Sequence, residues 1–186
     1  MRSLLLAGGR SSRMGRDKAL IEVDGVACIA RVASTLAAAG CEPIRIAVAQ
    51  PEDVERYGAV MPDGLDVEWV LDAVTHAGPI EALIEALTDP LFADTDSIQL
   101  CPVDVPWVTA DLFFELEKTL GSGDLLAVPA DPQRTHPLLA RVRPSIASKI
   151  AEDRRPLHVQ FSEMEHSTLL TEAAILRNVN TPDDLN

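Results

Sequence analysis

Lysine is scarce in this sequence. The chain has 186 residues, with 16 lysines and arginines against 29 aspartates and glutamates, which gives a formal net charge of -13. The only lysines are Lys18, Lys118 and Lys149. An acidic surface of this kind repels nucleic acid, so a nucleic-acid partner is not expected. We expect phosphate groups to bind only where cations are gathered locally.

Cysteine and long apolar runs are also scarce. Cys28, Cys41 and Cys101 are odd in number, far apart and in apolar surroundings, which excludes a disulfide framework and a zinc site and predicts buried thiols. No apolar run approaches the roughly 20 residues that a membrane span needs. The opening MRSLLLAGG is broken by glycine too early for a secretory signal. We therefore expect a cytoplasmic protein without membrane contact.

Internal repeats, low-complexity tracts and linkers are absent as well. Apolar residues make up 47% of the chain and charged residues 24%, which is ordinary for a globular protein. The length is close to that of one domain. We expect a single domain over residues 1–186.

Hydrophobic periodicity predicts alternating strands and helices. Apolar runs predict strands at 3–7, 44–49, 66–72, 97–104, 124–130 and 136–142, and helical spacing predicts helices at 26–40, 51–58, 79–87, 109–120 and 145–153. Strands joined by single helices imply right-handed crossovers, so we predict an α/β fold of three layers around a mostly parallel sheet. Ligands of such sheets bind beyond the carboxyl ends of the strands, where Asp72 and Asp104 fall.

The loop at 8–18 collects four cations in an acidic chain. Gly8 and Gly9 lack side chains and so let backbone N–H groups approach an anion, while Arg13 offers a planar fork and Lys18 a compact charge. The spacing matches neither a P-loop, in which lysine follows glycine directly, nor the G-x-G-x-x-G fingerprint of dinucleotide-binding folds. The residue types still favour a polyphosphate.

The same loop carries a family resemblance. Its pattern L-A-G-G-x-S-x-R-M-G-x-D-K resembles the signature of nucleotidyltransferases with a nucleotide-diphospho-sugar-transferase-like fold. Five later motifs are similar, in order, to those of the molybdenum cofactor guanylyltransferases: GPIEAL (78–83), CPVDVPWV (101–108), THPLLA (135–140), DRRPLHVQF (153–161) and NVNTPDDL (178–185). The resemblance implies a Rossmann-like nucleotidyltransferase fold. It also implies transfer of GMP from GTP to the terminal phosphate of molybdopterin, with release of pyrophosphate and dependence on Mg²⁺, or on Mn²⁺ in its place.

The resemblance also implies roles for individual residues on the nucleotide side. Asp104, held between two prolines after its strand, corresponds to the magnesium ligand. Arg13 and Lys18 would neutralise charge on the departing pyrophosphate, and with Asp104 they form the expected catalytic set. The expected nucleotide-binding residues are Leu6, Ala7, Gly8, Gly9, Lys18, Asp72, Gly78 and Asp104.

Another set of residues falls in motifs that the family places around the acceptor. These residues are His136, Arg154, Arg155, Asn178 and Asn180. An attacking phosphate oxygen is already ionised and needs no base, so His136 is expected to have a structural or acceptor-side role. The chain departs from the family pattern at Ala82, where a glycine is usual, and at Ala49 and Gln50, where an asparagine is usual.

Three interpretations remain open on the sequence alone. The first is the Mg²⁺-dependent guanylyltransferase, with GTP and molybdopterin or molybdenum cofactor as ligands and transient contacts with proteins that make or receive the cofactor. The second is a sibling nucleotidyltransferase that uses CTP with molybdopterin or acts on another phosphorylated small molecule. The third is a non-catalytic GTP-binding relative that takes part in cofactor delivery.

Overall fold

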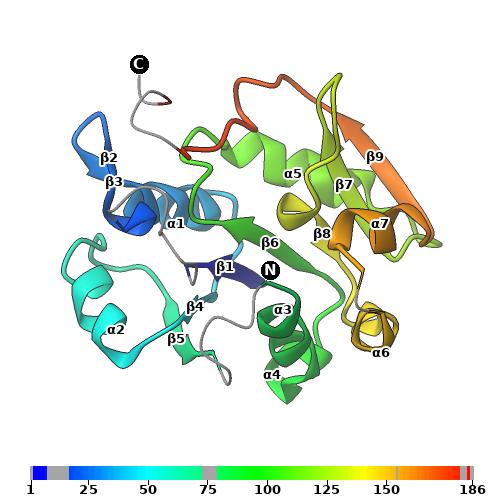
Figure 1. Cartoon of the computed structure of the whole chain (residues 1–186), viewed down its shortest axis with the longest axis horizontal. Coiled ribbons are helices and arrows are strands. Elements are labelled where there is room, and N and C mark those ends of the chain that lie inside the picture. Colours follow the sequence, from blue (N-terminus) through cyan, green and yellow to red (C-terminus); the bar gives the residue numbers. More distant parts are fainter. Residues whose placement is uncertain (1, 8–16, 73–78, 154, 181–183, 185–186) are drawn as a thin grey trace.

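The fold is built on a central sheet (Figure 1). The structure is a computed structural model that describes residues 2–7, 17–72, 79–153, 155–180 and 184. Within these residues the main sheet has seven strands in the order β5-β4-β1-β6-β8-β7-β9, and only β8 runs antiparallel to its neighbours. The strands are β1 (Arg2–Leu6), β4 (Ile44–Val48), β5 (Val67–Leu71), β6 (Ile98–Pro102), β7 (Leu126–Ala130), β8 (Arg141–Val142) and β9 (His166–Leu170).

Alternation along the strands divides the core into two apolar clusters, one on each face of the sheet. On β1, Leu5 belongs to one cluster, while Leu4 and Leu6 belong to the other. Burying each such leucine contributes roughly 1.5–3 kcal/mol. The first cluster packs under α1 (Cys28–Ala38), α2 (Pro51–Gly58) and α5 (Ala110–Thr119), and the second packs under α3 (Pro79–Thr88), α4 (Pro90–Ala93), α6 (Ala147–Glu152) and α7 (Leu157–Ser162). The predicted three-layer, mostly parallel α/β architecture is confirmed.

Helix α1 ends as its sequence predicts. Gly40 has a φ of 69°, in the left-handed region that glycine adopts without strain. Its N–H donates to the carbonyl of Ala37 at 2.8 Å, and the N–H of Cys41 donates to the carbonyl of Leu36 at 2.9 Å. This pair of bonds is the Schellman arrangement, which satisfies carbonyls that the end of the helix leaves open.

The start of α1 differs from the prediction. Residues 26–27 are not helical; they form strand β3 (Val26–Ala27), which pairs with β2 (Glu22–Val23) in a hairpin. Asp24 and Gly25 have φ values of 53° and 77°, which is the backbone of a tight hairpin turn. The Asp-Gly pair was the available signal for this hairpin, and the helical spacing that begins at Val26 masked it.

The predicted strand at 136–142 is only partly correct. Residues 137–139 form the short 3₁₀ helix η2 (Pro137–Leu139), and pairing begins at Arg141. Pro137 has no N–H to donate to a neighbouring strand, which explains the delay. Strand β9 and helix α7 were not predicted. Two further 3₁₀ helices are η1 (Lys18–Leu20) and η3 (Pro144–Ile146).

The three cysteines are buried and free, as predicted. Burial, followed by the charge of Asp104, raises the pKa of the Cys28 thiol to about 11. The thiols therefore remain protonated and packed in the core near neutral pH. In the described residues, no helix combines the length and the apolar content that crossing a bilayer would need.

Candidate active site

Several of the predicted site residues lie at the carboxyl ends of β1 and β6, which are neighbours in the sheet. Leu6 and Ala7 have buried side chains, so these side chains do not face a ligand. The carbonyl of Leu6 accepts a hydrogen bond from the N–H of Val103 at 3.1 Å, which ties the end of β1 to the residues after β6. Asp104 follows Val103 directly and so lies just beyond the carboxyl ends of these two strands.

Asp104 is the centre of a polar cluster that also contains Lys18, Asn178 and Asn180. The Lys18 ammonium donates to Oδ2 of Asp104 at 2.9 Å and to Oδ1 of Asn180 at 2.7 Å. The amide of Asn178 donates to the other carboxylate oxygen, Oδ1, at 3.1 Å. The side chains of Lys18 and Asp104 keep 25% and 18% of their exposure, so the cluster is sheltered but reachable by a ligand.

Asp17, the residue before Lys18, holds η1 against helix α2. Its Oδ1 caps η1 by accepting from the N–H of Ala19 at 3.1 Å. Its Oδ2 accepts from the hydroxyl of Tyr57 at 2.8 Å and from Nη2 of Arg56 at 3.0 Å. Burial, and then this bond to Asp17, raises the pKa of the Tyr57 hydroxyl, so Tyr57 is a fixed donor. No motif in the sequence indicates a role for Tyr57, whose bond to Asp17 links the segment that carries Lys18 to α2.

The segment at 177–180 is bound to the loop that follows β6. The N–H of buried Val179 donates to the carbonyl of Asp104 at 2.8 Å. The guanidinium of Arg177 lies 3.9 Å from the ring centre of Trp107, within cation–π distance. These contacts bring Asn178 and Asn180 to Asp104, although 74 residues separate Asn178 from Asp104 in the chain.

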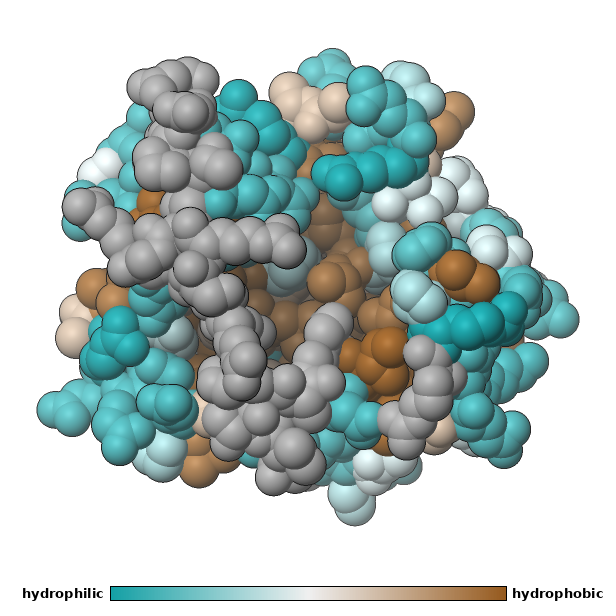
Figure 2. Space-filling view, viewed as in Figure 1, coloured by the Kyte–Doolittle hydropathy of each residue, from teal (hydrophilic) through white to brown (hydrophobic). Residues whose placement is uncertain are grey.

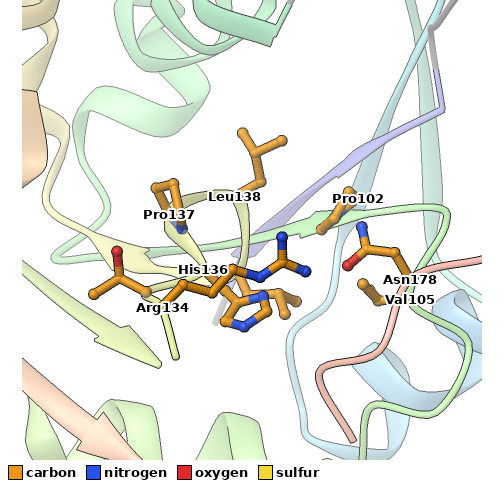
Figure 3. Close-up of a pocket in the computed structure, with 9 residues that line it drawn as sticks. Pro102, Val105, Arg134, His136, Pro137, Leu138 and Asn178 are labelled. Atoms are coloured by element: carbon orange, nitrogen blue, oxygen red, sulfur yellow. The ribbon is translucent and has the colours of Figure 1, made fainter. Parts of the chain in front are cut away.

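A pocket of about 160 Å³ opens beside this cluster. Figure 3 shows the side chains that line it, and the wider view of Figure 2 shows a hollow with an apolar floor in the middle of this face. The lining residues are Pro102, Val105, Arg134, Thr135, His136, Pro137, Leu138, Leu139 and Asn178. Asn178 belongs both to the pocket and to the polar cluster, so a ligand in the pocket would border Asp104.

His136 contributes to the wall of this pocket and is only 9% exposed. Its Nε2 lies 2.8 Å from Oδ2 of Asp131. The bond to His136 is the main cause that lowers the pKa of Asp131 to about 2, and the N–H of Gln133 adds to it. This pairing fixes the imidazole at the wall, consistent with a structural or acceptor-side role.

The remaining predicted residues are more dispersed. Asp72 follows β5 at the same edge of the sheet, three strand spacings or roughly 14 Å across from β6. Arg155 pairs with Asp153 and Glu163, each through Nη2 at 2.7 Å, and does not line the pocket. Gly8, Gly9, Arg13, Gly78 and Arg154 lie outside the described residues.

The oxygen donors of the cluster suit a hard divalent cation. Within the described ranges, no group of three or more His, Cys, Asp or Glu side chains is placed to hold a metal. Mg²⁺, however, is commonly held by one or two carboxylates together with substrate phosphates. Oδ2 of Asp104 and Oδ1 of Asn180 already converge on one cationic atom, Nζ of Lys18. One carboxylate and a neighbouring amide oxygen therefore fit such an ion.

Residues 3–160 match the family model of the MobA-like NTP transferase domain. The chain belongs to this family. A relative from Mycobacterium ulcerans, named probable molybdenum cofactor guanylyltransferase, is 31% identical over 189 residues, which cover 98% of this chain and 90% of the relative. One from Serratia proteamaculans, named molybdenum cofactor guanylyltransferase, is 29% identical and covers 97% of this chain and 90% of its own length.

Solved structures confirm the nucleotidyltransferase fold. Molybdopterin-guanine dinucleotide biosynthesis protein A from Archaeoglobus fulgidus aligns with a TM-score of 0.76 at 21% identity, covering all of this chain and 95% of its own. A Mycobacterium tuberculosis protein, solved as a complex with manganese, aligns with a TM-score of 0.71 at 19% identity and covers 98% and 94% of the two chains. At these sequence identities the structural similarity establishes the fold alone.

Proposed function

We propose that this chain transfers GMP from GTP to the terminal phosphate of molybdopterin and releases pyrophosphate. The observation that supports the proposal most directly is the convergence of Lys18, Asp104, Asn178 and Asn180 beyond the carboxyl ends of β1 and β6. The names of the sequence relatives supply the nucleotide and the acceptor. A single domain over residues 1–186 and a cytoplasmic location belong to the same proposal.

The nucleotide would occupy the side of the site formed by the ends of β1, β4 and β5. We assign Leu6, Ala7, Gly8 and Asp72 to the guanosine side, and Gly78, which precedes α3 in the sequence, to an anionic group of the nucleotide. Because the side chains of Leu6 and Ala7 are buried, their contribution would come from the backbone. Gly9, Arg13 and Lys18 would face the triphosphate. Lys18 would exchange its bonds to Asp104 and Asn180 for phosphate oxygens when the nucleotide binds.

The reaction in this proposal is an in-line displacement. An oxygen of the acceptor's terminal phosphate forms a bond to the α-phosphorus of GTP, and the bond from that phosphorus to the bridging oxygen of pyrophosphate breaks. Arg13 and Lys18 would stabilise the negative charge that grows on the departing pyrophosphate. The ionised acceptor needs no general base, which agrees with the pairing of His136 to Asp131.

Asp104 is the proposed ligand of a divalent metal, Mg²⁺ or Mn²⁺. Held by Asp104, such an ion would supply positive charge that offsets the negative charge of substrate phosphate groups. Asn178 would hold the Asp104 carboxylate in its orientation through the bond to Oδ1. The manganese complex of the Mycobacterium tuberculosis structure supports the use of a divalent ion by this fold.

Acceptor-side roles are proposed for His136, Asn178 and Asn180 and, from the family resemblance alone, for Arg154 and Arg155. Transient contacts with proteins that supply or receive the cofactor are part of the proposal too. The pocket that Asn178 lines lies next to Asp104, the proposed metal ligand.

One assay tests the proposed reaction. The purified chain is incubated with Mg²⁺, molybdenum cofactor and GTP, CTP, ATP or UTP in turn, and pyrophosphate release is measured with and without the cofactor. We expect release with GTP that depends on the cofactor. Turnover with CTP alone would overturn the base assignment. Tight GTP binding without turnover would favour the non-catalytic relative.

A further inference from the structure

Arg134, in the turn between β7 and η2, differs from the other arginines of the described chain. Each of the others bonds to an oxygen acceptor or lies over an aromatic ring. Among the residues that the structure describes, the Arg134 guanidinium has neither kind of partner. In a chain of net charge -13, an arginine without a carboxylate partner beside a pocket is free to bind an anionic ligand.

The backbone that carries Arg134 is held in place by Asp131. Oδ1 of Asp131 accepts from the N–H groups of Gln133 at 2.7 Å and Arg134 at 3.0 Å, and the N–H of Asp131 donates to the carbonyl of Arg134 at 3.0 Å. Oδ2 of the same carboxylate binds His136. One side chain thus fixes the turn and the imidazole beside it. A preorganised turn lowers the ordering cost of binding a ligand.

Arg134 also lies on the side of the site where the acceptor is proposed to bind. It lines the same pocket as Asn178, and Figure 3 shows its side chain extending toward Asn178. Asn178 binds Asp104 on one carboxylate oxygen, while Lys18, at the end of the loop after β1, binds the other. The pocket therefore reaches Asp104 through Asn178, whereas Lys18, the proposed triphosphate ligand, contacts the other oxygen of the same carboxylate.

We propose that Arg134 binds the terminal phosphate of the acceptor and orients it for attack. This inference rests on the proposed function. The planar fork of an arginine pairs with two phosphate oxygens at once, which fixes orientation as well as position. A cation at this wall would also offset the repulsion between the acceptor phosphate and Asp104. Arg134 would take this role in place of Arg155, whose guanidinium is occupied by two carboxylates.

The test compares the full-length wild type with Arg134→Gln, Arg134→Lys and Lys118→Gln. Lys118 is a matched control because it is a cation exposed on α5 and paired only with exposed Glu115. The KM for molybdenum cofactor and the KM for GTP are measured from pyrophosphate release, and cofactor binding without nucleotide is measured by equilibrium dialysis. A charge-assisted bidentate contact corresponds to a roughly 10- to 100-fold change in affinity.

We expect Arg134→Gln to raise the acceptor KM and dissociation constant by that factor and to lower kcat, because the acceptor phosphate is no longer oriented for attack, while the GTP KM changes little. Arg134→Lys should recover part of the loss, and Lys118→Gln should match the wild type. An unchanged acceptor KM in Arg134→Gln, with an active wild type, would overturn the role of Arg134 and leave the proposed function standing. A rise in the GTP KM instead would also overturn it. A wild type that neither binds nor uses the cofactor would overturn the proposed function and this inference together.

Discussion

The ammonium of Lys18 lies 2.9 Å from a carboxylate oxygen of Asp104, although 86 residues separate them in the chain. One residue ends the loop after β1, and the other follows the neighbouring strand β6. Parallel pairing of these strands brings their carboxyl ends together, and the bonds from α2 to Asp17 hold the segment that carries Lys18, so the expected phosphate-binding cation and the expected metal ligand meet. Asn178 then holds the second oxygen of Asp104.

Asp104→Asn tests the metal assignment. Asparagine has nearly the same shape and keeps an oxygen that can accept from Lys18, so the fold should be retained. Without the carboxylate charge, we expect turnover to fall at least about 100-fold, as for loss of a main electrostatic group. Pyrophosphate release over a range of Mg²⁺ concentrations measures the turnover, and a thermal melt checks that the fold is retained. A near-normal rate would contradict the role of Asp104.

Lys18→Met tests the cation of the phosphate-binding loop. Methionine keeps the length and the apolar stem but removes the charge, and we expect kcat with GTP to fall roughly 100- to 1000-fold. Lys118→Met, at an exposed position on α5, is the matched control and should retain the wild-type rate. Equal kcat values for the two variants would mean that Lys18 serves only to bind Asp104 and Asn180.

Local patterns in the sequence were enough to predict most of the sheet and the position of Asp104. The strand at 97–104 is a continuous apolar run that ends in a carboxylate, and a pattern of that kind needs no knowledge of the rest of the chain. The hairpin at 22–27 was missed because its Asp-Gly turn lies beside a helical spacing that begins two residues too early. Here a turn signal and a helix signal compete for residues 26–27, and in the structure these residues belong to the hairpin.

Residues that meet only through tertiary contacts could not be derived from the same patterns. The role of Asn178 near the acceptor was predicted from a family resemblance. Its contact with Asp104 depends on the bond from the N–H of Val179 to the backbone carbonyl of Asp104. Tyr57 and Arg134 had no signal in the sequence, since one is a lone tyrosine on a short helix and the other an arginine in a turn. Tyr57 matters because it contacts Asp17, and Arg134 because it lines the pocket. Hydrophobic periodicity gives no information on such contacts.

Tyr57→Phe tests whether Tyr57 positions the segment that carries Lys18. The change removes the hydroxyl that donates to Asp17 and leaves the buried ring in place. We expect the free energy of unfolding to fall by about 1 kcal/mol and the GTP KM to rise several-fold, with the acceptor KM unchanged. Ser162→Ala removes an exposed hydroxyl that bonds only to the local carbonyl of Val159 and serves as control. A loss of stability without any change in the GTP KM would show a purely structural role.

Asp131 should make the stability of the fold depend on pH in the acid range. The pKa of Asp131 is lowered from 3.8 to about 2 by the bond to His136. A carboxyl group whose pKa is lower in the folded state stabilises the fold fully above its ordinary pKa, and this contribution is lost as the pH falls through the folded-state value. The contribution is therefore complete above about pH 4 and declines between about pH 4 and pH 2.

Asp131→Asn should accordingly be less stable than the wild type at pH 7, and the difference between their urea midpoints should narrow as the pH falls from 4 toward 2. The exposed Asp63 provides a matched control, since Asp63→Asn removes a carboxylate without a comparable bond and should follow the wild type across the whole series. A gap between Asp131→Asn and the wild type that stays constant from pH 7 to pH 2 would mean that the ionised carboxylate contributes nothing beyond the shape of the turn. In that case the charge of Asp131 would not be needed to hold the wall of the pocket that carries Arg134 and His136.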